Sequence, residues 1–474
     1  MSELDTNPAN GDGLPSSGEA GGVVAKIKGH RLAQVMQGDG LRAKAMRGSG
    51  WTIAGFGAGQ VLRLGSNLIL TRLLFPEAFG LMALAQVFLQ GLNMLSDIGV
   101  GPSIVQNKRG DDPDFLATAW TMQVIRGFVL FLGMCALAYP ASLIYDEPLL
   151  FPILVLIGST AIVRGFQSIG MATANRKMAL GRLTMIELVS QIIGVTTMVT
   201  WAWLNPNVWA LVGGGVVASI VRVFLGHKVL KSAGNRFHFE RTAVKEIFHF
   251  GKWIFLATAC TYFGGQGLRL VQGYLVPIDI LGMISIAGML AIAADQLSKK
   301  IGGAVLFPAF SHIHQSRPHA LAGKLREART KLFVGTFPVF AVLIVFGFDI
   351  VNWLYDDRYA VAGGFLVLSA TGAAIASIRN PFGMVLIATG DSFGHAVIMG
   401  VTAGVRVAGV FVGFWYNGVV GMLVADIVAQ GLIYPFEVWR LRPKGLWFPL
   451  FDCVAFSGYL LLGAFSYMAG PFFS

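Results

Sequence analysis

The chain has 474 residues, of which 55% are hydrophobic and only 13% are charged, and its mean hydropathy is +0.65. Soluble globular domains carry about 25% charged residues, so this composition excludes an ordinary soluble protein and predicts lipid as the surrounding solvent. The net charge of +11 fits the loop-charge asymmetry of a membrane protein, and no nucleic-acid partner is expected.

Hydrophobic segments follow one another along the chain after a polar start. Residues 1–49 are rich in Gly, Ser, Asn and basic residues, which predicts a disordered, basic cytoplasmic tail. A spanning helix needs about 20 mostly apolar residues. The sequence therefore predicts an all-α multi-pass membrane protein, with 12–14 transmembrane helices and thirteen candidate spans at 51–75, 78–102, 115–139, 149–172, 182–204, 208–230, 252–276, 281–309, 332–355, 361–389, 393–416, 418–440 and 447–469.

Lysine and arginine are distributed unevenly between the two sides of the predicted membrane. With a cytoplasmic N-terminus, the cytoplasmic loops and their helix edges hold 25 of the 36 Lys and Arg residues, the opposite loops hold one, and ten lie inside spans. Cytoplasmic loops of membrane proteins carry this excess of positive charge. The pattern predicts a protein of the bacterial inner (cytoplasmic) membrane with its N-terminus in the cytoplasm.

A short sequence repeat links the first and seventh predicted spans. Residues 59–64 read GQVLRL and residues 265–270 read GQGLRL, with five of six positions identical. An even number of spans separates the copies, so the repeat is parallel, with an axis along the membrane normal. This predicts a six-helix N-lobe at 50–230, a cytoplasmic linker at 231–251, a six-helix C-lobe at 252–440 and a hydrophobic extension at 441–474.

Basic side chains inside the spans are costly, at about 2.5–3.5 kcal/mol each at the bilayer centre. Eight lie deep in the predicted helices: Arg63, Arg126, Arg164, Arg269, Lys299, Lys300, Arg379 and Arg406. Asp295 stands four residues before Lys299 and can pair with it. The other buried acids, Asp97, Glu187 and Asp426, are too few for the remainder. Unpaired basic groups are therefore expected to face a watery cavity.

Polar residues at helical spacing accompany two of these arginines. Gln60, Arg63 and Asn67 share one face of the first span, and Gln266, Arg269 and Gln272 share one face of the seventh. Arginine favours phosphate because its planar fork forms bidentate hydrogen bonds. The predicted site for a diphosphate and its sugars contains Arg63, Arg269, Lys299, Arg379, Arg164, Gln60, Asn67 and Gln266. Asp97, Glu187 and Asp295 are candidates for coupling transport to an ion gradient.

Motifs for catalysis and for cofactor binding are missing from the sequence. It contains no HExxH, Walker, GxSxG or paired CxxC pattern, and the predicted outward loops are too short for a folded domain. Its three cysteines, Cys135, Cys260 and Cys453, lie in apolar runs without metal-ligand spacing. We therefore expect a transporter that is not an enzyme and that carries no cofactor and no metal.

Two segments resemble a known family. Residues 70–80, LTRLLFPEAFG, and residues 96–106, SDIGVGPSIVQ, are similar to the polysaccharide and O-antigen repeat-unit flippases of the multidrug/oligosaccharidyl-lipid/polysaccharide exporter superfamily. The resemblance covers about residues 45–440. It implies two six-helix lobes in a V shape around a cationic cavity. Relatives have twelve or fourteen helices, whereas thirteen are predicted here, so a lipid groove formed by two extra helices is not expected.

The resemblance also implies a function. An undecaprenyl-diphosphate-linked oligosaccharide would move from the cytoplasmic to the periplasmic leaflet by alternating access, for exopolysaccharide, capsule or O-antigen synthesis. Membrane lipids and the polysaccharide polymerase and export machinery are the partners that this reading names. A lipid II flippase is an alternative, and a multidrug antiporter is disfavoured because its cavity should be acidic. A membrane glycosyltransferase is disfavoured by the short outward loops.

Overall fold

A computed structural model describes residues 41–96, 99–230, 232, 234–247, 262, 266–301, 310, 313 and 318–470. Every regular element in these ranges is helical, which confirms the predicted all-α fold. The first part of the chain forms α2 (Leu41–Leu73), α3 (Pro76–Leu95), α4 (Val100–Gln106), α5 (Pro113–Ile144), α6 (Leu150–Gly165), α7 (Gly170–Arg176), α8 (Leu180–Leu204) and α9 (Val208–Val229). The second part forms α11 (Gly267–Leu275), α12 (Ile278–Ile301), α14 (Leu321–Val345), α15 (Gly347–Leu354), α16 (Ala362–Ala388), α17 (Ser392–Leu441) and α18 (Pro449–Met468).

Most long helices match the predicted spans, but α14 begins eleven residues before the predicted span at 332–355 and ends ten residues before its end. Nine described helices are long and apolar enough to cross a membrane, or ten if α6 and α7, which meet at a 64° bend, form one broken span. The 50-residue helix α17 is two spans, because the backbone leaves the helical conformation at Asn417 and Gly418. Gly418 has φ of 53°, a conformation that favours glycine. This break lies where the sequence predicts the turn between two spans.

Some predicted boundaries differ from the structure. Helix α2 already begins at Leu41, ten residues before the predicted span at 51–75, so the basic residues before Trp51 extend this helix beyond its apolar part. Of the predicted seventh span, only Tyr262 and the segment from Gln266 onward are described. Cys260, Gly265, Asp97 and residues 1–40 lie outside the described residues.

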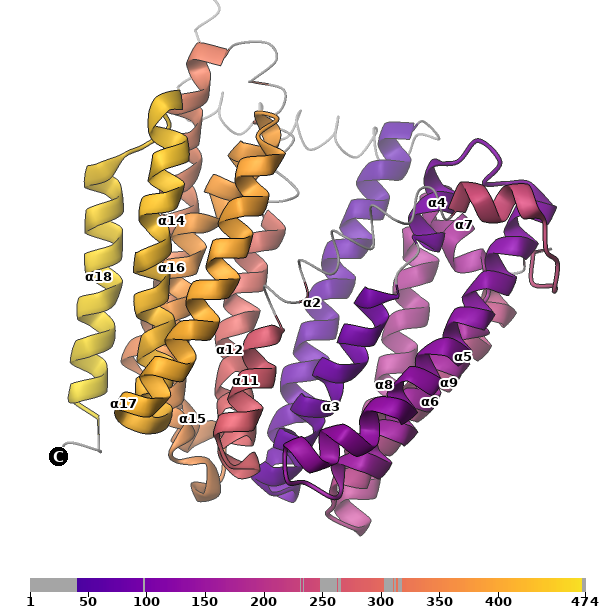
Figure 1. The fold of residues 1–474 in the computed structure, drawn as a ribbon, viewed down its shortest axis with the longest axis horizontal. Coiled ribbons are helices and arrows are strands. Elements are labelled where there is room, and N and C mark those ends of the chain that lie inside the picture. The colour runs from indigo at the N-terminus through magenta and orange to yellow at the C-terminus, as the bar shows by residue number, and fades with distance from the viewer. Residues whose placement is uncertain are drawn as a thin grey trace, which may run out of the picture.

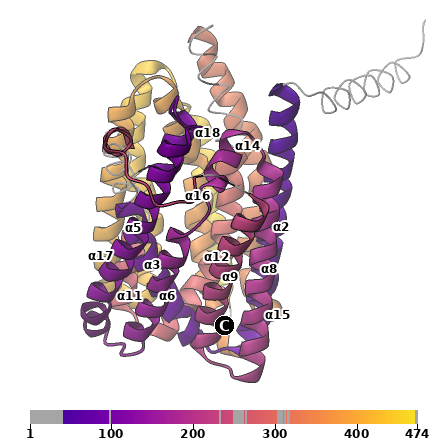
Figure 2. The ribbon, with the colours of Figure 1, turned by 90° about the vertical axis from the view of Figure 1, so that its right-hand side faces the viewer.

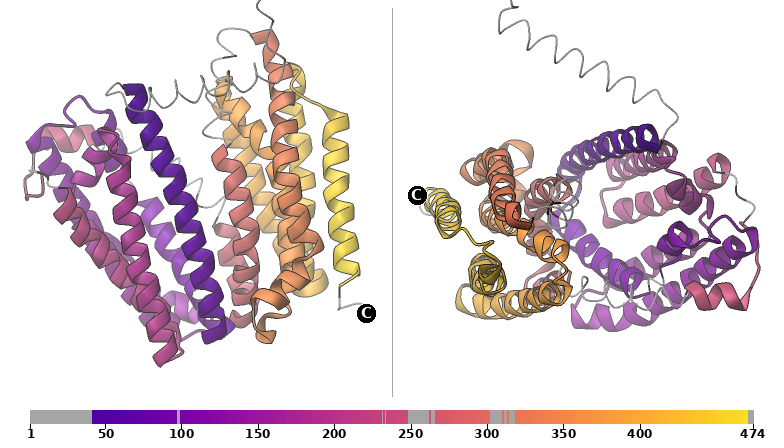
Figure 3. Two further views of the ribbon diagram at one scale, coloured as in Figure 1. Left: turned by 180° about the vertical axis from the view of Figure 1, so that it is seen from behind. Right: turned by 90° about the horizontal axis from the view of Figure 1, so that it is seen from above.

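The helices form two bundles that lean toward each other (Figure 1). One bundle, the N-lobe, holds α2 to α9, and the other, the C-lobe, holds α11 to α18. The bundles meet at the end where α2 gives way to α3, and they diverge toward the end where α2 begins. The view from behind agrees (Figure 3), and Figure 2 shows the molecule from the side of the N-lobe. Helix α18 packs on the outside of the C-lobe against α14 and α16. The predicted two-lobe architecture with one extra C-terminal helix is therefore confirmed.

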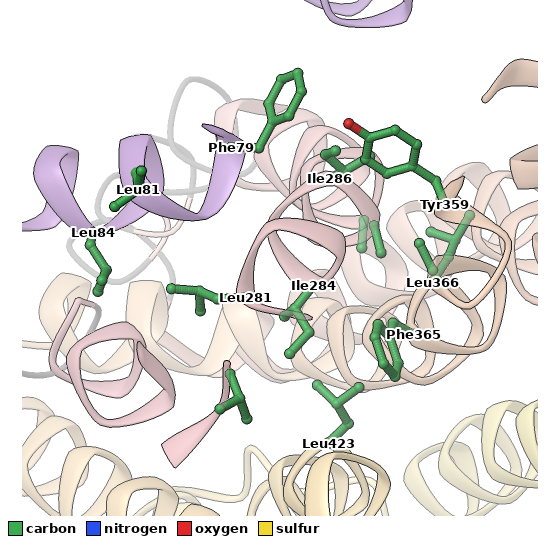
Figure 4. Packing of buried hydrophobic residues seen from close by; sticks show 14 of the residues in the cluster. Phe79, Leu81, Leu84, Leu281, Ile284, Ile286, Tyr359, Phe365, Leu366 and Leu423 are labelled. Carbon is green, nitrogen blue, oxygen red and sulfur yellow. The ribbon is translucent and has the colours of Figure 1, made fainter. Parts of the chain in front are cut away.

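A hydrophobic cluster joins the lobes where they converge. Phe79 and Leu84 of α3 belong to the same buried cluster as Leu281 and Ile284 of α12 (Figure 4). The buried Tyr359 ring contacts Phe79 edge-on, with 6.3 Å between ring centroids. Because this cluster excludes water from the convergent end, burial of apolar surface holds that end closed.

Two glycines let the lobes approach closely at the same place. A β-carbon on Gly80 of α3 would lie 2.0 Å from the Ile278 carbonyl oxygen, and one on Gly282 of α12 would lie 1.9 Å from the Pro76 carbonyl oxygen. Gly80 lies four residues after Pro76, and Gly282 lies four residues after Ile278. The two contacts are therefore equivalent, and the crossing has pseudo-two-fold symmetry. Small residues allow helix backbones to meet in this way in membranes.

Hydrogen bonds between the lobes reinforce this junction. The Tyr359 hydroxyl donates to the Leu74 carbonyl at 2.9 Å, and the Arg358 guanidinium donates to the Arg72 carbonyl at 3.1 Å. The Tyr145 hydroxyl donates to the Leu270 carbonyl at 3.1 Å. The carbonyls of Arg72 and Leu74 lie at the end of α2, where intrahelical partners are missing, so the bonds from Arg358 and Tyr359 satisfy them.

The linker between the lobes is fastened to the far end of the N-lobe. The Arg109 guanidinium donates to both Glu240 carboxylate oxygens, at 2.9 and 2.7 Å, and also bonds Asp112, which caps α5. This double hydrogen bond to Arg109 lowers the pKa of Glu240 to about 2. The Glu240 backbone N–H donates to the Thr118 hydroxyl at 3.1 Å. The start of the linker is therefore docked on α5.

Candidate substrate site between the lobes

A polar pocket lies where the N-lobe faces α12 of the C-lobe. Its volume is about 390 Å³, and its polar lining side chains are Gln60 and Arg63 of α2, Thr184, Glu187 and Gln191 of α8, and Gln296 of α12. Two of these residues, Gln60 and Arg63, belong to the polar stripe predicted on the first span, and Glu187 is a predicted coupling candidate. A pocket lined by both lobes can change shape when the lobes move relative to each other.

Close packing of α2 against α8 shapes this pocket. A β-carbon on Gly55 would lie 2.1 Å from the Thr184 methyl group, so only glycine fits there without displacement. The Gln191 amide donates to the Gly59 carbonyl at 3.0 Å, which ties the two helices one turn further along. Gln60 and Arg63 follow on the same helix and are held at the edge of the pocket.

Arg63 is the charged group of this pocket without a counter-ion. Its side chain is exposed and makes no ion pair with any described residue. Glu187, on the opposite wall, is already paired with Arg222 of α9 at 2.7 Å. A guanidinium in this position can form bidentate hydrogen bonds to a phosphate group.

Arg164 lines a second pocket inside the N-lobe. This pocket has a volume of about 580 Å³ and is lined by α3, α6 and α9. Arg164 forms no salt bridge in the part of the chain that the structure describes, although Arg222 and Glu187 lie within electrostatic range of it. Arg126, by contrast, donates to the Ser96 hydroxyl at 3.0 Å and to the Asn93 carbonyl at 2.6 Å.

The structure separates three other predicted residues from the pocket of Arg63. Asn67 is buried beside Tyr355 and is not among the residues that line the pocket of Gln60 and Arg63. Arg269 is partly buried on α11, and Gln266 stands at the start of that helix. Arg269 makes no ion pair within the described ranges, so its charge is uncompensated there.

In the helices α12, α16 and α17 of the C-lobe, three predicted basic residues have carboxylate partners. The predicted pair of Lys299 and Asp295 forms with 2.6 Å between nitrogen and oxygen. Arg379 is buried and holds both oxygens of Glu437, at 2.9 and 2.8 Å, in addition to the Gln430 amide oxygen. These contacts place Arg379 inside the bundle of α16 and α17, away from the space between the lobes.

Another arginine pair joins the two halves of α17. Arg406 donates to both oxygens of Asp426, at 2.6 and 3.1 Å. Asp295 receives a further hydrogen bond from the Asn380 amide at 3.1 Å. Asp295, Lys299 and Asn380 therefore form one polar group between α12 and α16, and Arg406 lies within electrostatic range of Asp295.

Sequence reasoning missed several polar residues. It did not count Glu437 or Asp452, which pair with Arg379 and Arg329. Glu437 was missed because it lies near the end of its span, and Asp452 because it stands at the start of the thirteenth helix. It also missed Gln191 and Gln296, which no motif marks. Gln296 stands three residues before Lys299. A search for polar residues at helical spacing on the eighth span would therefore have found it.

Comparison with known proteins identifies the family. A family described as polysaccharide biosynthesis protein matches residues 69–363, more than half of the chain. The chain belongs to this family. The lipopolysaccharide biosynthesis protein WzxC of Escherichia coli (strain K12) is 24% identical over 356 residues, which cover 73% of this chain and 70% of WzxC. The succinoglycan biosynthesis transport protein ExoT of Rhizobium meliloti (strain 1021) is 22% identical, over 65% of this chain and 63% of ExoT.

A solved structure has the same fold. The lipid II flippase MurJ in an inward closed conformation superposes with a TM-score of 0.66 at 14% identity, covering 88% of this chain and 97% of MurJ. This likeness agrees with the two-lobe arrangement seen here. The family member described here is thus a multi-pass membrane protein with the fold of a transporter.

Proposed function

We propose that this protein is a flippase that moves an undecaprenyl-diphosphate-linked oligosaccharide repeat unit from the cytoplasmic to the periplasmic leaflet of the bacterial inner membrane. The observation that carries the proposal is Arg63, a cation without a counter-ion among the described residues, in a polar pocket that both lobes line. Family membership supports the assignment to polysaccharide synthesis, as do the names of two relatives, a lipopolysaccharide biosynthesis protein and a succinoglycan biosynthesis transport protein.

In this proposal the diphosphate binds Arg63. Gln60 and Gln296 flank it on α2 and α12 and can donate hydrogen bonds to phosphate oxygens from both lobes. Arg269, which has no counter-ion among the described residues, is the second cation that the diphosphate would meet. Arg379 is left out because Glu437 and Gln430 already occupy its guanidinium.

Transport follows from rocking of the lobes about their convergent end. With the N-terminus in the cytoplasm, the divergent end faces inward, so the substrate enters from the cytoplasmic side. The cluster around Phe79 and Tyr359 must then separate, and the other end must close. Asp295 is the candidate for ion coupling, because protonation of its carboxylate would release Lys299 and Asn380 at the inner edge of α12. Protonation of the Glu187 carboxylate would release Arg222 in the same way.

The test uses a deletion of the gene in the source bacterium, followed by complementation. Undecaprenyl-linked intermediates and surface polysaccharide are measured in the same cells. We expect lipid-linked repeat units to accumulate and polysaccharide to disappear in the deletion strain and with Arg63→Ala. The exposed Lys324→Ala is the matched control and should restore both.

Two other results would overturn the proposal. Normal polysaccharide together with loss of viability would move the function to lipid II. Normal polysaccharide together with new drug sensitivity would move it to drug export. Co-purification with a polysaccharide polymerase would extend the proposal to the partners that act on the product.

A further inference from the structure

Helix α3 has two unlike faces. Leu81, Leu84 and Ala85 are buried, and this side of the helix packs against α12 and the rest of the core. Gln86, Gln90 and Asn93 lie on the other side and line the 580 Å³ pocket inside the N-lobe. Their spacing of four and then three residues places the three amides in one row along the helix.

The amides of this row have free hydrogen-bonding capacity. Gln86 makes no hydrogen bond with the described residues, and Gln90 makes only a long contact of 3.9 Å to the Met94 sulfur. Asn93 donates to the Leu89 carbonyl at 2.8 Å, which leaves its own amide oxygen open. An amide that both donates and accepts matches a sugar hydroxyl, which does the same.

Two hydroxyl groups on the facing helices add acceptors. Thr160 of α6 and Ser219 of α9 are buried, and each donates its proton to a backbone carbonyl of its own helix. Their oxygen lone pairs remain available to a donor in the pocket. The volume is within the 300–1,000 Å³ typical of ligand pockets.

Arg164 gives this pocket a positive charge. None of the described residues that line the pocket is acidic, and Arg164 is its one ionised group. Since Arg222 and Glu187 nearby form a neutral pair, the field in the pocket is that of a single positive charge. An acidic group on the ligand would be stabilised there, whereas a cationic ligand would be disfavoured.

The pocket is a neighbour of the Arg63 site. Glu187 lines the pocket of Arg63, and its charge also acts on Arg164. Both pockets therefore lie within electrostatic range of the same carboxylate.

We propose that this pocket is a carbohydrate subsite for the repeat unit, in which Gln86, Gln90 and Asn93 bind sugar hydroxyls and Arg164 binds an acidic substituent on one sugar. The proposal rests on the proposed function, since it places the sugars of the flipped lipid next to its diphosphate. It assigns the cargo to acidic oligosaccharides.

The experiment measures binding of three lipids to the purified full-length protein in detergent by native mass spectrometry. The first probe is undecaprenyl diphosphate without sugar. The second is the lipid-linked repeat unit extracted from the deletion strain. The third is the same repeat unit after chemical reduction of its carboxyl groups to alcohols.

We expect the wild-type protein to bind the native repeat unit most tightly. The double variant Gln86→Leu/Gln90→Leu should weaken binding of both glycosylated probes about tenfold, as for two lost neutral hydrogen bonds, and leave undecaprenyl diphosphate unchanged. Arg164→Gln should remove about a tenfold preference for the native over the reduced repeat unit. Lys324→Gln, on the surface, should change none of these.

Specific outcomes would overturn the subsite. Equal binding of undecaprenyl diphosphate and the glycosylated probes by the wild-type protein would do so, as would equal weakening of all three probes in the double variant. A repeat unit without any acidic group would overturn the role of Arg164. Failure of the wild-type protein to bind any of the three lipids would instead contradict the proposed function itself.

Discussion

Arginines in two regions of the molecule, the bundle of α16 and α17 and the pockets of the N-lobe, differ in how their charge is compensated. In the C-lobe, Arg379 and Arg406 each hold a carboxylate through two hydrogen bonds, whereas Arg63 and Arg164 of the N-lobe line pockets and have no counter-ion among the described residues. A buried pair holds helices together, and an uncompensated cation facing a pocket can bind an anion. The comparison shows that a basic residue at membrane depth is not by itself a substrate ligand.

The largest effect is expected from breaking a buried pair of the C-lobe. Arg329 of α14 and Asp452 of α18 are both 1% exposed and paired with each other, and the Arg329 guanidinium also lies over the rings of Phe382 and Phe451. Asp452→Asn leaves this cation uncompensated, so it should lower the free energy of unfolding by about 3–5 kcal/mol. Thermal unfolding of the purified protein in detergent measures the change.

The matched control removes both charges. Arg329→Met combined with Asp452→Leu should recover most of the stability, because hydrophobic replacement of a buried pair is often neutral. The double variant should also retain polysaccharide export. If the double variant folds but does not export, these residues act in transport and the contrast between paired and unpaired arginines fails.

A smaller loss is expected from removing the charge of the N-lobe pocket. Arg63→Gln should reduce flipping by about 30-fold, equivalent to about 2 kcal/mol, because one charged contact to the diphosphate is lost. Thermal stability should stay near that of the wild type, since Arg63 has no described partner to leave unpaired. Arg63→Lys should retain part of the activity. A large drop in stability with Arg63→Gln would show a structural role.

Closure of the lobes can be tested where α3 and α12 cross closely at Gly80 and Gly282. Gly282→Ala places a methyl group against the Pro76 carbonyl and should destabilise the closed junction by about 1–3 kcal/mol. Gly288→Ala on the same helix meets nothing within 4 Å and is the matched control. Distances between spin labels on the two lobes, measured by electron paramagnetic resonance, should shift toward separation at this end only for Gly282→Ala. An unchanged distance distribution would show that the crossing does not set the equilibrium.

The smallest effect concerns the linker. The pKa of the Glu240 carboxyl is lowered to about 2, so its contribution to docking the linker is complete above its ordinary pKa of 4.5 and is lost as the pH falls toward 2. Proteolysis of the linker should therefore be independent of pH between 5 and 8. Glu240→Gln should raise the cleavage rate throughout this range. A strong rise in wild-type cleavage between pH 8 and pH 5 would contradict this assignment.

Sequence reasoning was most successful where one physical quantity decides the outcome. Apolar length and loop charge set which segments cross the bilayer, so the break of α17 at Asn417 was predicted correctly. The i,i+4 pair of Asp295 and Lys299 was predicted because its geometry is local. The partners of Arg379 were not, because Glu437 lies 58 residues away and only helix packing brings the two together.

By itself, the sequence determined that the chain lies in a membrane, that it is helical, and that it consists of two related halves, because hydropathy, charge asymmetry and an internal repeat are written along the chain. Only the tertiary structure decided which basic residues are compensated. Arg63 and Arg379 look alike in sequence, each a lone arginine inside an apolar span. They differ because α17 presents Glu437 to one, while α2 and α8 leave a pocket beside the other. Such pairing depends on how helices distant in the chain are rotated and packed against each other, and no local pattern encodes this.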